Sequence, residues 1–386
     1  MISVQSRQQP LNGNNMQKKG IVVVLLIICI GFNLKANSVK ALPFEKEYRV
    51  ALMLPFCLGN PDKWKVRDIM ADYYEGVEMA IANMEAQGLK MQLTVLDTKQ
   101  DSLEVIRLLK ETPGLEQYDL IIGPVYDNEL FEVEKFCSVY NIPLVSPLRP
   151  YNKTLQTDFP LINCSATDSM QMYYTGQMVA DAFKQFQVVL VDDQNKAAKS
   201  YAAKQFKLGY ESVNKQGCSV VDGKLTTVAS VWNKKDSVLA VFTNKSSSSC
   251  NLAIGLNNAM SLIALGPAEW LSIDRMNYGS LNGLYFYDTY SVPYNDTTYK
   301  QFRKQYRLKY GGDPERYTFI GYDQFVFFST ALMAFDKDFI HQVLNKSFQS
   351  THRNFQFVRR GNVFENAGSN LFYYQDYNLY KAFWRY

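Results

Sequence analysis

The residues best suited to binding chemistry lie in short stretches that follow apolar runs. Arg149 carries a planar guanidinium, which can pair with a carboxylate or a phosphate through two hydrogen bonds. Tyr126 and Tyr287 carry flat rings that can stack on the ring of a ligand. The candidate ligand-binding residues share this position in the chain, and they are Phe56, Asp97, Tyr126, Asp127, Ser146, Arg149, Asp193, Asn244 and Tyr287. Each also has a structural explanation, since aspartates cap helices and a surface arginine is solvated.

Groups that catalysis requires are scarce in this chain. The only two histidines, His341 and His352, lie in no recognisable nucleophile or metalloprotease motif. The sequence contains no glycine-rich phosphate loop and no pair of cysteines at the spacing of a zinc site. We therefore predict no catalytic residues, no metal and no cofactor. An enzyme with a Rossmann-like fold is a third hypothesis, because active sites depend on geometry more than on motifs.

The net charge of +4 originates at the N-terminus. Residues 1–41 contain five basic side chains and no acidic one, and the rest of the chain has 36 basic against 37 acidic side chains. A chain that is almost neutral beyond its first 41 residues lacks the basic surface of a nucleic-acid-binding protein. We therefore expect no nucleic-acid partner.

The N-terminal segment has the pattern of an export signal. A basic pair at 18–19 precedes an uncharged run at 20–32, which is shorter than the roughly 20 residues that span a bilayer. We expect residues 1–41 to be a signal peptide, with Met16 as an alternative start, and an uncleaved membrane anchor as the other interpretation. A large residue precedes Cys29, which disfavours a lipoprotein. The expected location is the periplasm or the cell envelope.

The cysteines beyond this segment do not form an evident framework. There are five of them, so at least one thiol is unpaired, and they are Cys57, Cys137, Cys164, Cys218 and Cys250. Cys137 falls at an apolar helical spacing, which is typical of a small buried hydrophobic residue. A disulfide between Cys218 and Cys250 is conceivable in an oxidising compartment, but the sequence does not support it by itself.

Strands and helices are predicted to alternate from Tyr48 onward. The first round of predicted strands covers 49–54, 91–96, 119–122 and 142–146, and the second covers 188–191, 238–242, 262–265 and 283–287. Between them, apolar residues recur at helical spacing, and Asp101 and Asp168 are expected to cap helices. Two later helices are expected at 298–310 and 322–335, followed by a hairpin at 371–374 and 379–383. Continuous apolar strands between helices indicate parallel sheets that are covered on both faces.

The order of these pieces resembles a known family. The matching pieces are the strand RVALMLPF, Tyr74-Glu75-Gly76, DLIIGP, NIPLVSP, the segment 166–171, YRLKYGGDPERYTFIGYD and the hairpin FQFVRRGNVFENAG. Together they resemble type I periplasmic binding proteins, such as the leucine/isoleucine/valine-binding proteins and their receptor relatives, in a Bacteroidetes-type variant. The resemblance extends from Tyr48 to the last residue.

This resemblance implies an α/β fold of two Rossmann-like lobes with parallel central sheets, joined by a hinge that the chain crosses several times. Lobe 1 would comprise 48–164 and 292–345, and lobe 2 would comprise 165–290 and 350–386. The family binds its ligand between lobes that close by a hinge. Independently, ligands of open parallel sheets bind beyond the carboxyl ends of the strands, which selects the same loops.

The family's function would be non-enzymatic binding of a small ligand for ABC-type uptake or for sensing. Where amino-acid binders carry small hydroxyl residues, this chain has Val125-Tyr126-Asp127 and Leu148-Arg149-Pro150. A free branched-chain amino acid is therefore not the expected ligand. The alternative is a non-catalytic envelope module with a vestigial cleft, resembling activators of cell-wall enzymes. The expected partner is accordingly a small molecule or an envelope protein, with membrane contact only through the N-terminal segment.

Overall fold

The computed structural model describes the chain in segments. They are residues 47–86, 90–148, 159–192, 201–222, 227, 230, 237–260, 262–273, 278–289, 296–350 and 353–382. The expected signal peptide, Cys29, Arg149, Asp193 and His352 lie outside these residues. No helix in the described segments has the length and hydropathy that crossing a bilayer would require.

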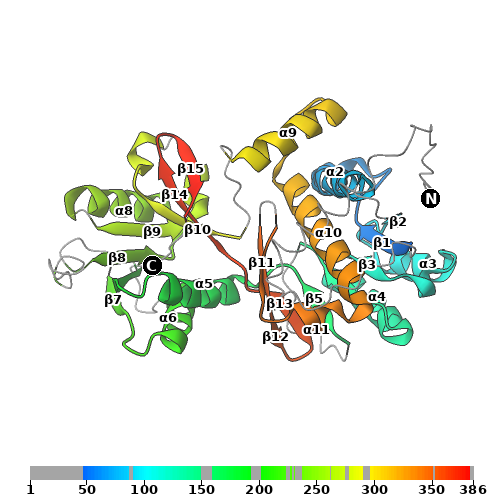
Figure 1. The fold of residues 1–386 in the computed structure, drawn as a ribbon, viewed down its shortest axis with the longest axis horizontal. Helices are drawn as coiled ribbons and strands as arrows, with labels where there is room; N and C mark the ends of the chain where they lie inside the picture. Colours follow the sequence, from blue (N-terminus) through cyan, green and yellow to red (C-terminus); the bar gives the residue numbers. More distant parts are fainter. Residues whose placement is uncertain are drawn as a thin grey trace, which may run out of the picture. The chain divides into compact units, whose positions relative to one another are not determined.

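The described residues form two units (Figure 1). Unit 1 takes the described residues of 47–165, 306–350 and 355–366, and unit 2 takes those of 166–305, 353–354 and 367–382. The chain therefore passes between the units after Ser165, before Tyr306, between Ser350 and Arg353, after Asn354 and after Asn366. The several crossings that the sequence predicts are present in this division.

Unit 1 is built on a sheet with, among the described residues, eight strands in the order β11-β12-β13-β5-β4-β3-β1-β2. The strands are β1 (Tyr48–Leu54), β2 (Met91–Asp97), β3 (Leu120–Ile122), β4 (Leu144–Ser146), β5 (Leu161–Asn163), β11 (Ser347–Gln349), β12 (Asn354–Arg360) and β13 (Val363–Asn366). Strands β1 to β5 pair with one another in parallel and β13 pairs in parallel with β5, while β12 and β13 pair antiparallel. The four strands predicted in the first round are confirmed as β1 to β4.

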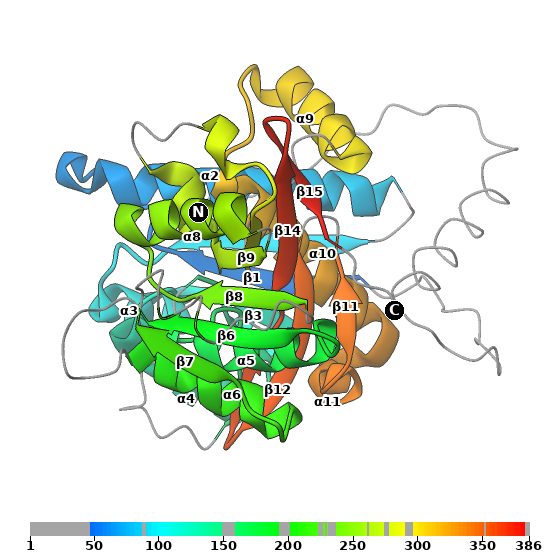
Figure 2. The same cartoon turned by 90° about the vertical axis from the view of Figure 1, so that its left-hand side faces the viewer.

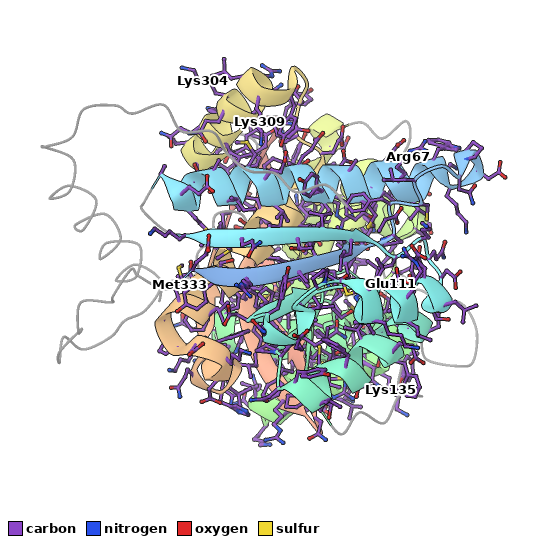
Figure 3. The ribbon with its side chains drawn as sticks, turned by 90° about the vertical axis from the view of Figure 1, so that its right-hand side faces the viewer. Arg67, Glu111, Lys135, Lys304, Lys309 and Met333 are labelled. Carbon is purple, nitrogen blue, oxygen red and sulfur yellow. The ribbon has the colours of Figure 1, made fainter. Side chains whose placement is uncertain are left out.

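Helices cover both faces of this sheet, as continuous apolar strands require. Figure 3 shows α2 on one side of β1 and β2, and α3 and α4 on the other. The helices of unit 1 are α2 (Trp64–Glu85), α3 (Ser102–Glu111), α4 (Asp127–Tyr140), α10 (Arg316–Phe335) and α11 (Phe339–Val343), with short 3-10 turns η1 (Pro61–Lys63), η2 (Leu115–Gln117) and η5 (Asp336–Asp338). Ala51 and Met53 of β1 belong to the core against α3 and α4. Helices α2 and α10 pack together so closely that a Cβ at Gly76 would lie 1.9 Å from the carbonyl oxygen of Thr318.

Unit 2 is built on a second sheet, which has seven strands among the described residues in the order β15-β14-β10-β9-β8-β6-β7. Its strands are β6 (Gln187–Asp192), β7 (Ser219–Asp222), β8 (Val238–Phe242), β9 (Ile263–Pro267), β10 (Tyr285–Asp288), β14 (Asn370–Gln375) and β15 (Asn378–Lys381). Strands β6 to β10 are parallel to their neighbours, and β14 and β15 extend the sheet antiparallel from β10. The predicted second round of strands and the terminal hairpin are confirmed.

The two faces of the second sheet are covered by different helices (Figure 2). These helices are α5 (Asp168–Ala182), α6 (Tyr201–Val213) and α8 (Ser247–Met260), with short turns η3 (Ala268–Ser272) and η4 (Tyr278–Leu281). Along β6, Val188 and Leu190 pack in the core with α5 and α6, whereas Val189 and Val191 pack in the core with α8. Alternate side chains of a strand point to opposite faces, so one continuous apolar run serves both cores.

The bounds of the two units differ from the expected lobe boundaries at two places. The hairpin of β12 and β13 belongs to unit 1, because β13 pairs in parallel with β5 and extends the first sheet. Helix α9 (Thr297–Tyr310), assigned to lobe 1 by expectation, is divided, and its residues up to Gln305 group with unit 2. The apolar pattern of a hairpin or helix shows which face is buried, but it does not show which sheet that face covers.

Candidate ligand-binding site

The carboxyl ends of β8, β9 and β10 in unit 2 meet at a pocket of about 300 Å³. Its lining residues come from β10, from the segments that follow β8 and β9, and from the N-terminal turns of α5 and α6, and they are Asp168, Ser169, Gln171, Met172, Tyr201, Ala202, Thr243, Asn244, Lys245, Glu269 and Tyr287. Neighbouring parallel strands end at the same edge of a sheet, which is where ligands bind in open α/β sheets. The volume lies at the lower end of the range of small-molecule sites.

Charged groups face this pocket from three elements. The ammonium of Lys245 lies 2.5 Å from a carboxylate oxygen of Glu269, and both side chains are about half exposed. Partial burial lowers the pKa of Lys245, but the hydrogen bond and charge of Glu269, with the charges of Asp168 and Asp288, outweigh burial and raise it. Lys245 is therefore a persistent cation beside two lining carboxylates, Asp168 and Glu269.

The two predicted residues in this pocket are held by their own hydrogen bonds. The hydroxyl of Tyr287 donates to the carbonyl oxygen of Phe242 at 3.1 Å, and burial raises the pKa of that hydroxyl. The side-chain oxygen of Asn244 accepts from the backbone amide of Ser246 at 3.0 Å. Tyr287 thus offers its ring rather than its hydroxyl, and Asn244 shapes the loop that presents Lys245.

Helix starts supply the remaining polar groups. Thr167, rather than the predicted Asp168, caps α5, because its hydroxyl accepts from the backbone amide of Met170 at 3.3 Å. Asp168 is the first helical residue and lines the pocket. Ser169 donates a hydrogen bond to the hydroxyl of Tyr201 at 3.3 Å, which joins the first turns of α5 and α6. The N-terminus of a helix carries partial positive charge, which favours a ligand oxygen at this place.

In unit 1, both carboxylate oxygens of the predicted residue Asp97 accept hydrogen bonds from backbone amides. One carboxylate oxygen accepts from the amides of Cys57 and Lys99, and the other accepts from the amide of Leu58, each at 2.9 Å. A carboxylate that accepts three amide hydrogen bonds has little capacity left for a ligand. Asp97 therefore organises the loops after β1 and β2.

The other unit 1 candidates lie at the same strand-end edge. Phe56 is half-buried and its ring contacts that of Tyr74 edge-on, with centroids 6.0 Å apart. Tyr126 and Asp127 are half-buried at the start of α4, while Ser146 is 2% exposed at the end of β4. This edge therefore presents rings and little free polar surface.

The loop after β4 is fixed by a buried amide. The Gln324 side chain, which is fully buried, donates to the carbonyl oxygen of Pro147 at 2.8 Å and accepts from the hydroxyl of Tyr73 at 2.7 Å. The next carbonyl along the loop, that of Leu148, accepts from the hydroxyl of Ser165 at 3.2 Å. Gln324 thus joins α10, α2 and the loop that leads toward Arg149.

Replacing Gln324 by leucine is expected to lower the free energy of unfolding by about 2–3 kcal/mol, since two buried hydrogen bonds are lost. The matched change Tyr73→Phe removes only one of them and should cost about 1 kcal/mol. Urea unfolding followed by circular dichroism measures both. Equal stability of Gln324→Leu and the unmodified chain would show that these bonds contribute nothing.

Solved structures with this architecture include binding and regulatory proteins. A putative branched-chain amino acid ABC transporter protein from Rhodospirillum rubrum matches with a TM-score of 0.61 at 10% identity, over 87% of this chain and 100% of that one. The LpoA C-domain from Haemophilus influenzae, a regulator of PBP1A, matches with a TM-score of 0.57 at 13% identity, again over 87% and 100%. This chain has the type I periplasmic binding protein fold. No family model and no curated protein matches it.

The type I binding-protein fold is thus shared by a transporter component and by a regulator of another protein. A shared fold does not select between these functions, so the choice must come from the sites. A further match is an ABC transporter substrate-binding protein from Desulfitobacterium hafniense, with a TM-score of 0.50 at 13% identity over 87% of this chain and 100% of that one.

The structure brings Asn244 and Tyr287 together in the unit 2 pocket and leaves the unit 1 candidates at their own strand-end edge. Asp168, Tyr201 and Glu269 also line this pocket, although they are not among the ligand-binding residues predicted from the sequence. Glu269 lies two positions after Pro267, the last residue of β9, so a wider window after each strand would have included it. Asp168 was interpreted as a cap, which is the commoner role of an aspartate at a helix start.

Proposed function

We propose that this chain is an exported, non-catalytic binding protein whose unit 2 pocket takes a small solute. The observation that carries this proposal is the pocket at the carboxyl ends of β8, β9 and β10, with Lys245, Glu269 and Asp168 facing it. This is the position at which open parallel sheets bind ligands. The export segment at 1–41 and the resemblance to transport proteins support a role in uptake or sensing.

The chemistry of the pocket favours a solute that carries an amine. Its described lining residues include two carboxylates and one ammonium, so they hold one net negative charge. A cationic group on the solute would replace Lys245 as the partner of Glu269, while the helix starts would accommodate an oxygen. The ring of Tyr287 provides an apolar wall.

The second candidate function is regulation of an envelope protein through surface contact. The specific observation that favours it is the internal use of polar groups at the unit 1 edge, where Asp97 and Gln324 bind the protein's own backbone. In that case the pocket of unit 2 would be vestigial.

A thermal-shift screen of amine-bearing and other polar metabolites separates the two functions. A solute that binds the folded chain raises the melting temperature in proportion to the logarithm of its concentration. We expect at least one such solute, and isothermal titration should then give a dissociation constant that rises tenfold or more in Glu269→Ala, since a charged hydrogen bond is worth about 1.5–3 kcal/mol. In Lys245→Ala the dissociation constant should fall, because the ammonium that competes with the solute for Glu269 is removed.

Lys184→Ala is the matched control for these variants. It removes another exposed ion pair of unit 2, that of Lys184 with Asp181 at 2.7 Å, away from the pocket. Its affinity should equal that of the unmodified chain. If no solute stabilises the chain and an envelope protein is captured with it instead, the regulatory function is correct and the solute-binding one is wrong.

A further inference from the structure

Glu129 of unit 1 has an unusual environment for a carboxyl group. Its side chain is fully buried in the first turn of α4, and neither of its oxygens makes a hydrogen bond of standard geometry within the described residues. The hydroxyl of Thr98, also fully buried, likewise makes no hydrogen bond of standard geometry within the described residues. Buried polar atoms without such a bond are uncommon in folded proteins and costly, so two of them side by side require an explanation.

The groups around Glu129 belong to neighbouring strand-end loops. The Thr98 hydroxyl and the Asp101 backbone come from the loop between β2 and α3, and the Tyr126 backbone comes from the loop between β3 and α4. Burial raises the pKa of Glu129 to about 7, against the smaller opposing effect of these three groups. The side chain therefore changes charge near neutral pH.

Other titratable groups interact electrostatically with Glu129. The negative charge of Asp101, at the start of α3, adds to the rise in the pKa of Glu129. From the loop after β1, burial raises the pKa of Cys57, and the charges of Asp97 and Glu129 raise it further, while Lys63 and Arg67 oppose them. Asp127 is the other acidic residue in the first turn of α4. The acidic surroundings favour an uncharged Glu129.

We propose that Glu129 is a positioning residue, which in its uncharged form packs in the buried space between the β2–α3 and β3–α4 loops and allows them to stay together. Ionisation releases the proton to solvent and leaves a charge buried between the loops, which the Thr98 hydroxyl and the backbone of Tyr126 and Asp101 offset only in part. Asp97 ends β2 immediately before the first of these loops, and Tyr126 lies in the second. The link from Glu129 to ligand binding therefore rests on the proposed function.

The direction of the pH dependence follows from the raised pKa. Because Glu129 binds its proton more tightly in the closed arrangement than in an open one, the stabilisation is complete at low pH and is lost as pH rises through about 7. With an ordinary value of 4.5 in the open arrangement, local opening should be about tenfold more populated at pH 8 than at pH 6.

Hydrogen exchange of the unliganded mature chain tests this inference. After correction for the intrinsic exchange rate, peptides that cover 97–101 and 126–130 should lose about tenfold in protection between pH 6 and pH 8. In Glu129→Gln, which cannot ionise, their protection should not change with pH. Asp72→Asn is the control, because burial raises the pKa of Asp72, in α2 of the same unit, to about 6; this variant should keep the pH dependence.

A carbon-13 NMR titration of glutamate carboxyls in the unmodified chain measures the same group directly and needs no variant that must fold. A Glu129 pKa near 4.5, or an equal pH dependence in Glu129→Gln, would overturn the proposal. Both experiments use protein without ligand. Their failure would therefore leave the proposed solute binding intact, and failure to find a solute would leave this result intact.

Discussion

Gly209→Ala is expected to destabilise the chain by about 3 kcal/mol or more. Helices α5 and α6 cross at this residue, and a Cβ there would lie 1.9 Å from the carbonyl oxygen of Tyr173 and 2.7 Å from its carbonyl carbon. These atoms belong to backbone, so no side-chain rotation can relieve the overlap. The helices would have to separate, which would open the core that lies beneath the pocket-lining turns.

Gly255→Ala is the matched control in the same unit. Gly255 lies in α8, is exposed, and has no atom within 4 Å of the position that a Cβ would take. Alanine should therefore stabilise this helix by about 0.5–1 kcal/mol, because it loses less conformational entropy than glycine on folding. Urea unfolding of both variants gives the comparison. Similar stabilities for the two would mean that α5 and α6 do not cross as closely as described.

Asp97→Ala is expected to lower the free energy of unfolding by about 3 kcal/mol, because three backbone amides lose a charged acceptor. Asp97→Asn keeps the oxygen that accepts from Cys57 and Lys99 and should cost only about 1 kcal/mol. Denaturant unfolding and ligand titration are measured on the same preparations. If Asp97→Ala folds with unchanged stability but no longer binds the solute, then Asp97 is a ligand-binding residue, as the sequence predicts, and the structural role assigned here is wrong.

The sequence predicts the strands well because their apolar runs are buried on both faces. The strand predicted at 238–242 coincides with β8, and the run at 49–54 differs from β1 by one residue. Asp101 is confirmed as the cap of α3, since its side chain accepts from the amide of Leu103 at 2.9 Å. Such local signals depend on neighbours in the chain, and a single sequence contains them.

The candidate site is less predictable, because it depends on what each polar group already binds. Asp97 follows a strand as a ligand-binding residue would, yet its oxygens are used by amides 39 and 40 residues away in the chain. Asn244 and Tyr287 do line a pocket, but Glu269 and Tyr201 join them only through the fold. The disulfide considered between Cys218 and Cys250 is not formed, and all five described cysteines are free thiols.

The most direct measurement is hydrogen exchange of the mature chain with and without the solute that the thermal-shift screen selects. We expect added protection in peptides that cover 168–172 and 243–245, together with the segment around Glu269, because these line the unit 2 pocket. Protection elsewhere in the chain, with none in these three segments, would contradict this expectation.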